Sequence, residues 1–392
     1  MLFSTNNIAK ILSTFSFIME LYIFFNDDIC IKIVTNNINL NEVLLSIAKN
    51  YIYQSHSKIE GKIELTKIIL ILIRNLLFNI EKDEQSQFAP LIDLTNQFLV
   101  QSYEAKSNLL LYESLETLSI ITESELHLQE DLYTIMFNII SDSSFNDEIM
   151  TNSLQICCNI IDAIEHSYKN NNSNFEIIYN SNTVKSLKRF IGTFLILNNN
   201  CTKQDFSIKK DLLIYSLRFL GKIINFNKLS SLELDNSIVS LFQTEKTGNL
   251  SLILNSIFES AQFEQCAEIN REILHFYIII YESKFFQIKN FLLDEIKLHK
   301  CFAQKMKDMD NNDIIFDILE LIESALSYSE MRQQLNIIKE DLIYCGFVEL
   351  IENMQINHIN EAIRSKSEEI VSQFFVKDII DDFDLANYMN VR

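Results

Sequence analysis

The stretch that decides the fold begins Asp313-Ile-Ile-Phe-Asp-Ile-Leu-Glu-Leu-Ile-Glu-Ser-Ala-Leu326. After a polar break it continues as Asp341-Leu-Ile-Tyr-Cys-Gly-Phe-Val-Glu-Leu-Ile-Glu-Asn353, and then as a segment from His358 to Phe375. Apolar residues recur in it every three or four positions, which is the spacing of one face of an α-helix. The stretch therefore predicts three amphipathic helices with one glycine, Gly346, at a helix boundary, followed by the acidic run 378–384.

The composition of the whole chain points the same way. One Pro and five Gly in 392 residues leave few positions for tight turns between strands, while 48% hydrophobic residues supply a large core. No Pro/Gly/Ser-rich linker divides the chain, so we expect one elongated all-α array over residues 1–392 rather than separate globular domains.

Internal repetition refines this expectation. Five segments have the pattern of the innermost helix of successive units, namely 65–77, 112–123, 153–161, 216–224 and 270–279. Aligning them places Asn75, Ile120, Asn159, Lys222 and Ile279 at one equivalent position, which Ser324 extends, at spacings of 45, 39, 63, 57 and 45 residues. Three spacings lie near the roughly 40 to 47 residues of armadillo and HEAT units. The polar stretches 166–174 and 225–247 fall within the two long spacings, and we interpret them as surface loop insertions.

Such repeats predict a right-handed superhelical α-solenoid of about 7 to 9 armadillo/HEAT-type units. Each unit stacks on its neighbours because it cannot bury its apolar faces alone. The innermost helices, called third helices below, are then expected to line a concave groove.

Charge and cysteines narrow the function. The formal net charge of −20 disfavours nucleic acid as a ligand and favours basic partners. The seven cysteines are scattered and form no C-x-x-C pair, which is typical of free thiols in a reducing compartment, so we expect the cytoplasm or nucleus.

Neither a membrane anchor nor an active site is expected. The apolar run 11–25 contains Glu20, and the run 68–80 is short and contains Arg74, so both are interpreted as buried helices. The sequence has no G-x-G-x-x-G, G-x-x-x-x-G-K-[ST], H-E-x-x-H or G-x-S-x-G motif. We predict a non-enzyme without cofactor or metal.

The stretch 313–384 resembles the final armadillo repeat of importin alpha. The resemblance rests on Cys345-Gly346 before an amphipathic helix, on the loop Asn357-His-Ile-Asn-Glu361, and on a closing helix that ends in Phe374-Phe375 before acidic residues. The segments 216–224 and 269–275 also resemble repeat helices of that family.

In importin alpha, a Trp and an Asn four residues later project from the third helices and hold the lysine stems and the backbone of a nuclear localisation signal. The resemblance places the Asn position at Asn75 and Asn159, with Ile120, Lys222 and Ile279 elsewhere. The chain contains no Trp, and the Trp position is taken by Ile71, Glu116, Gln155, Arg218 and His275. The candidate peptide-binding residues are Asn75, Asn159, Glu116, Arg218 and His275.

Two functions follow as expectations. The first is an importin-alpha-like adaptor that binds basic cargo peptides or proteins, with importin beta or a recycling exportin as a further partner. The family's basic importin-beta-binding segment has no counterpart in residues 1–60, and the Trp/Asn array is degenerate, so signal binding should be weak or altered. The alternative is an armadillo/HEAT scaffold for a different protein partner, with no role in nuclear import.

Overall fold

The computed structural model describes residues 40–49, 59–78, 89–123, 130–142, 144–169, 181–194, 203–225, 232–243, 249–259 and 267–375. Within these ranges the chain is helical apart from short turns and helix caps and has no strand, which confirms the predicted all-α class. The residues divide into two compact units, 1–177 and 178–392. Each unit is described by itself. The apolar run 11–25 and the acidic run 378–384 lie outside the described residues.

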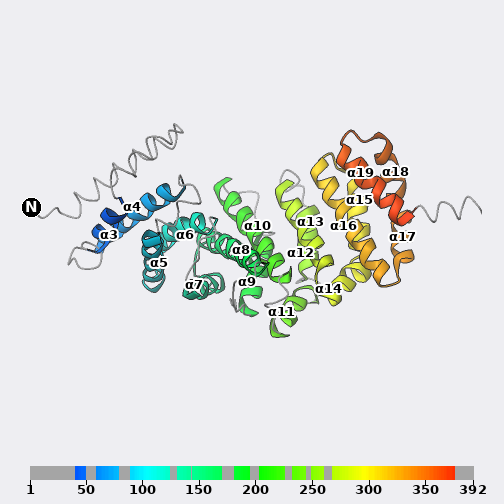
Figure 1. Ribbon diagram of the computed structural model, residues 1–392. Coiled ribbons are helices and arrows are strands. Elements are labelled where there is room, and N and C mark those ends of the chain that lie inside the picture. The colour runs from blue at the N-terminus through cyan, green and yellow to red at the C-terminus, as the bar shows by residue number, and fades with distance from the viewer. Residues whose placement is uncertain are drawn as a thin grey trace, which may run out of the picture. The chain divides into compact units, whose positions relative to one another are not determined.

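The first unit has two layers of helices. Its helices are α3 (Leu40–Ile47), α4 (Ile59–Phe78), α5 (Ala89–Glu104), α6 (Asn108–Glu123), α7 (Glu130–Ser141) and α8 (Asp147–Lys169). Helix α6 packs against both α4 and α8, while α5 packs against α3, α6 and α7 (Figure 1). The predicted third helices α4, α6 and α8 therefore form one layer, as the repeat alignment expects.

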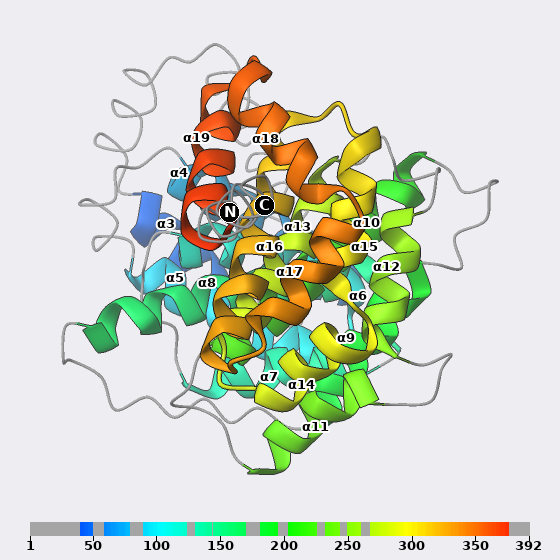
Figure 2. The same ribbon diagram turned by 90° about the vertical axis from the view of Figure 1, so that its right-hand side faces the viewer.

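The second unit continues with a longer series. Its helices are α9 (Ser181–Phe194), α10 (Lys203–Asn225), α11 (Leu232–Gln243), α12 (Leu250–Glu259), α13 (Ala267–Glu282), α14 (Phe286–Asn290), η4 (Phe291–Glu295), α15 (Leu298–Lys305), η5 (Met306–Asp308), α16 (Asn312–Met331), α17 (Leu335–Tyr344), α18 (Phe347–Asn357), α19 (Glu361–Ile370) and η6 (Val371–Phe375). The predicted third helices α10, α13 and α16 pack in that order, and α19 packs on α16 (Figure 1). Helices α15 and α17 pack on each other and on α16 (Figure 2). Both units thus have the layered packing of an α-solenoid.

Close packing and capping follow from particular residues. At Gly221 of α10, an added Cβ would lie 3.1 Å from Ile279 Cδ1 of α13, so the glycine permits a close approach of these third helices. Asparagine, which is frequent in this chain, begins several helices. The Oδ1 atoms of Asn146, Asn311 and Asn360 accept backbone N–H hydrogen bonds at the starts of α8, α16 and α19.

The C-terminal stretch confirms the predicted glycine boundary and adds a helix to it. Gly346 lies between α17 and α18 with φ of +72°, a left-handed conformation that favours glycine. Lys307 Nζ donates to the carbonyl oxygen of Cys345 at 2.6 Å and so satisfies a group at the end of α17. The segment 341–353 therefore belongs to two helices rather than one.

The two predicted loop insertions contain helix. Residues 166–169 extend α8, because neither Gly nor Pro interrupts it there, although 170–174 lie outside the described residues. Within 225–247, α11 spans Leu232–Gln243. Its buried Ile238, Leu241 and Phe242 have helical spacing, so the apolar residues of this polar stretch form an amphipathic helix.

Candidate functional site

The repeat alignment defines an edge that runs along the third helices of each unit. We call it the aligned edge. Its first position in each helix is Ile71, Glu116, Gln155, Arg218, His275 and Glu320, and its second is Asn75, Ile120, Asn159, Lys222, Ile279 and Ser324. Every one of these side chains is half-buried, whereas the residues between them are mostly buried. The five candidate residues thus lie on comparable, partly exposed positions of successive helices.

In the first unit, Glu116 joins three third helices. Its Oε2 accepts a hydrogen bond from Arg74 Nη1 of α4 at 3.4 Å, and its Oε1 accepts one from Asn152 Nδ2 of α8 at 2.8 Å. Asn159 of α8 donates from Nδ2 to Thr122 Oγ1 of α6 at 3.1 Å. The predicted site residues Glu116 and Asn159 therefore bind the neighbouring helices of their own layer.

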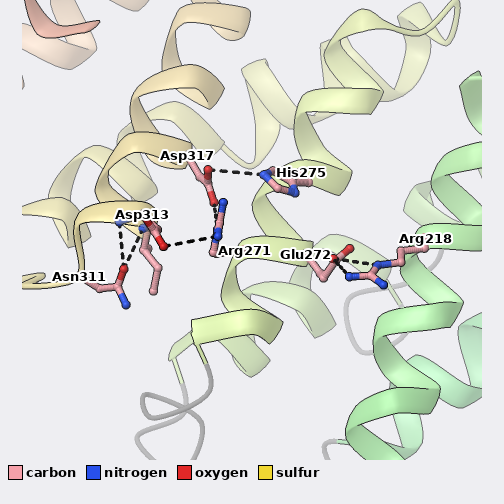
Figure 3. Close-up of polar contacts among 8 residues, drawn as sticks. Arg218, Arg271, Glu272, His275, Asn311, Asp313 and Asp317 are labelled. Atoms are coloured by element: carbon pink, nitrogen blue, oxygen red, sulfur yellow. Dashed lines mark hydrogen bonds and ion pairs between the residues drawn. The ribbon is translucent and has the colours of Figure 1, made fainter. Parts of the chain in front are cut away.

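In the second unit, the aligned edge is crossed by ion pairs (Figure 3). Arg218 of α10 donates from Nε to Glu272 Oε1 of α13 at 2.9 Å. His275 of α13 lies with Nε2 3.4 Å from Asp317 Oδ1 of α16, and Arg271 donates from Nε to Asp317 Oδ2 at 2.9 Å. Asp317 is nearly inaccessible, with 3% of its side chain exposed, so the Arg271 guanidinium of α13 neutralises a buried carboxylate of α16, and His275 adds positive charge when it is protonated.

One positional rule relates these contacts. In each pair, the side chain at the first aligned position of one third helix contacts a residue on the next third helix. That residue lies three positions before the first aligned position of its own helix. The rule relates Glu116 to Asn152, Arg218 to Glu272 and His275 to Asp317, pairs that are 36, 54 and 42 residues apart in sequence. Stacked third helices therefore keep one axial offset in both units, although the loops between them differ in length.

Burial and hydrogen bonding shift the pKa values of groups on and beside this edge. Burial raises the pKa of the Glu113 carboxyl, which has Lys67 Nζ at 3.8 Å and Arg74 Nη1 at 3.5 Å. Burial and the nearby Glu116 carboxylate raise the pKa of Tyr112 to about 12. The hydrogen bond to Asp317 raises the pKa of His275. These shifts accompany contacts between helices, so they reflect packing as well as any binding role.

The chemistry available at the edge is recognition by hydrogen bonds and charge. Among the described residues, no group of three His, Cys, Asp or Glu side chains is arranged to hold a metal ion. No helix in the described ranges is long and apolar enough to cross a membrane. The edge presents amide groups at Asn75, Gln155 and Asn159, and its carboxylates Glu116, Glu272 and Asp317 already have partners on neighbouring helices.

Sequence reasoning placed the first aligned positions but missed their partners Asn152, Glu272 and Asp317. A signal for them exists, because each lies three residues before an aligned position. The alignment alone did not show how far one stacked helix is shifted along its axis relative to the next. That shift brings the residue three positions before an aligned position into contact with the neighbouring helix.

Comparisons with known proteins add the following. No known family profile and no curated protein sequence matches the chain. Among solved structures, the chain is similar to the crystal structure of an engineered protein, a target of the Northeast Structural Genomics Consortium. That similarity has a TM-score of 0.43 at 10% sequence identity and covers 72% of this chain and 95% of the other.

Proposed function

We propose that this protein is an importin-alpha-like adaptor that binds a basic, extended peptide along the aligned edge of α4, α6 and α8. The observation that carries the proposal is that Asn75 and Asn159, both at the second aligned position, are half-buried on third helices of one layer. Amides at this spacing can hydrogen-bond a peptide backbone, and a net charge of −20 attracts a basic segment.

The C-terminal stretch supports the same proposal. Its resemblance to the final importin alpha repeat rests on Cys345-Gly346, and Gly346 occupies a turn between two helices in a conformation that favours glycine. The proposal includes a right-handed armadillo solenoid, basic cargo, importin beta or a recycling exportin as a second partner, and residence in cytoplasm and nucleus.

A peptide titration tests the adaptor proposal. A lysine-rich signal peptide should bind weakly and with strong salt dependence, because no Trp walls the lysine stems and long-range attraction is screened within about 10 Å at 0.1 M salt. The double variant Ile71→Trp and Gln155→Trp places Trp four residues before Asn75 and Asn159. Fluorescence anisotropy should then show tighter binding with less salt sensitivity.

The matched control adds two tryptophans away from the aligned edge. Leu109 and Leu252 are exposed by 47% and 39%, so Leu109→Trp with Leu252→Trp adds the same side chains at partly exposed sites. If the edge variant binds no better than this control while its helical circular dichroism is intact, the edge does not hold a signal peptide.

A second candidate function is a helical-repeat scaffold for a different protein partner. The observation that favours it is the pairing of Glu116, Glu272 and Asp317 within the protein, which lowers the negative charge that the edge offers to a basic peptide. Affinity capture from the source cell separates the two candidates. Importin beta or a recycling exportin among the captured proteins favours the adaptor, and a reproducible partner of another class favours the scaffold.

A further inference from the structure

The second unit contains a cavity of about 500 Å³ that lies apart from the aligned positions. It is formed where α12 and α13 meet the segment from Lys305 to Ile314. Its lining combines an apolar part, Phe258, Met309 and Ile314, with an acidic part, Glu259, Asp308 and Asp310, and with Asn270, Lys305 and Asn311. An apolar wall beside carboxylates fits a ligand that has both a hydrocarbon stem and a positive charge.

Lys305, the one cation among the described lining residues, is already engaged. Lys305 Nζ lies 2.9 Å from Glu259 Oε1 and also 4.9 Å from the centre of the Phe258 ring. Asp308 and Asp310 are exposed, and neither has a cationic partner within the described ranges. The lining therefore keeps two uncompensated carboxylates, which favours a cationic ligand over an anionic one.

Asn270 supplies an independent indication of a ligand. The residue is 4% exposed and lines the cavity, yet its Oδ1 atom accepts no hydrogen bond from the residues that the structure describes. Buried amide oxygens are normally paired, because an unpaired one loses its hydrogen bonds to water without replacement. A donor from a ligand would satisfy this atom.

We propose that this cavity binds the cationic side chain of a lysine or arginine from a partner protein segment. The hydrocarbon stem would lie against Phe258, Met309 and Ile314, and the charged head would donate to Asn270 Oδ1 and meet the carboxylates of Asp308 and Asp310. This inference rests on the proposed function only in assuming a basic partner. The residues that line the cavity do not belong to α4, α6 or α8.

The experiment uses the full chain with ¹³C-labelled methionine methyl groups. Three blocked tripeptides are titrated, acetyl-Gly-X-Gly-amide with X as lysine, arginine or norleucine, together with 1,5-diaminopentane. Met309 lines the cavity and reports binding, while Met331, which is 71% exposed and outside the cavity, is the internal control. We expect saturable shifts of Met309 with the lysine or arginine peptide and none with norleucine.

Two variants test the assignment of the head group. Asp308→Asn with Asp310→Asn removes exposed charge, and Asn270→Leu removes the unpaired acceptor. Each should weaken binding roughly tenfold, which is the usual effect of losing one charge-assisted contact. The matched control, Glu330→Gln with Glu340→Gln, changes the net charge equally at exposed positions outside the cavity and should leave binding unchanged.

Three results would overturn the proposal: no shift of Met309 with either cationic peptide, equal shifts with norleucine, or weakening by the control as large as that by the cavity variants. Tighter binding of the diamine than of both peptides would assign the cavity to a free polyamine instead. Because the tripeptides are read at Met309, failure here is separate from failure of the peptide titration on α4, α6 and α8.

Discussion

The aligned edges of the two units obey one positional rule with different chemistry. In the first unit the rule pairs Glu116 with the neutral amide of Asn152, and a further amide contact joins Asn159 of α8 to Thr122 of α6. In the second unit the rule pairs Arg218 with Glu272 and His275 with Asp317, and Arg271 also reaches Asp317. The offset between stacked helices is thus independent of charge. Both units carry ion pairs between third helices, such as Arg74 with Glu116 in the first and Arg218 with Glu272 in the second, but only the first has asparagines at its second aligned positions.

The largest effect is expected where the second unit buries a charge. Arg271→Met with His275→Gln removes the guanidinium and the imidazole that contact Asp317 and should lower the free energy of unfolding by on the order of 3 kcal/mol, because a buried carboxylate loses its compensation. Urea denaturation followed by circular dichroism measures it. Lys284→Met, which breaks the partly exposed pair with Asp235, is the control and should cost less than about 1 kcal/mol. Equal losses would show that Asp317 is no anchor of this edge.

Acid should affect the second unit through a different histidine. His299 of α15 is fully buried, and its burial lowers its pKa to about 4, despite Asp341 Oδ2 at 3.5 Å from Nε2. Because the pKa of His299 is lower in the folded state than in the unfolded state, this residue stabilises the fold fully only above about pH 6.5. This stabilisation, about 3 kcal/mol, should be lost as the pH falls from about 6.5 to 4.

Stability profiles between pH 4 and 8 check this expectation. The acid loss should be absent from His299→Gln, and an unchanged slope in that variant would contradict it. His275 should act with the opposite sign, since its pKa is raised. Its contribution is complete below about pH 6.5 and disappears as the pH rises through its folded pKa, and it should be small because 43% of its side chain is exposed.

The matching change in the first unit should cost less. Lys67→Met with Arg74→Met removes both cations beside Glu113, as the double variant above removes the two groups beside Asp317. Burial already raises the pKa of Glu113, so this carboxyl takes up a proton more readily than an ordinary one. We expect a loss of about 1–2 kcal/mol at pH 7, smaller at pH 5, in the same urea assay. A loss as large as that for Asp317 would remove the distinction between the two edges.

The smallest effect concerns the amide contact. Asn159→Leu breaks the hydrogen bond to Thr122 Oγ1 and should cost about 0.5–1 kcal/mol. Asn159 is also a candidate peptide contact, so the variant should weaken binding of the lysine-rich peptide by more than its stability loss explains. Thr122→Val is the control, because it breaks the same bond and keeps the amide. Equal binding by both variants would remove Asn159 from the proposed peptide site.

Sequence patterns predicted the helical class, because it depends on local periodicity. Ile71 and Arg218, which the alignment places at one equivalent position, differ chemically, yet both are half-buried. Sequence did not predict which residues meet across helices. Arg218 and Glu272 are 54 residues apart, and the connection between them contains α11, which the polar composition of 225–247 concealed. The acceptor at Asn270 was also missed, because burial by residues distant in sequence leaves no local pattern.

The fixed offset between stacked third helices has a consequence for how this sequence can diverge. Each contact joins only neighbouring third helices, so a replacement at Arg218 is compensated at Glu272 and not at a distance. Loops between the partners can lengthen freely, since the offset is set by packing and not by chain length. Relatives of this protein should therefore show paired substitutions. One member of each pair is a first aligned position, and the other is the residue three positions before the first aligned position of the next third helix, even where the loops cannot be aligned.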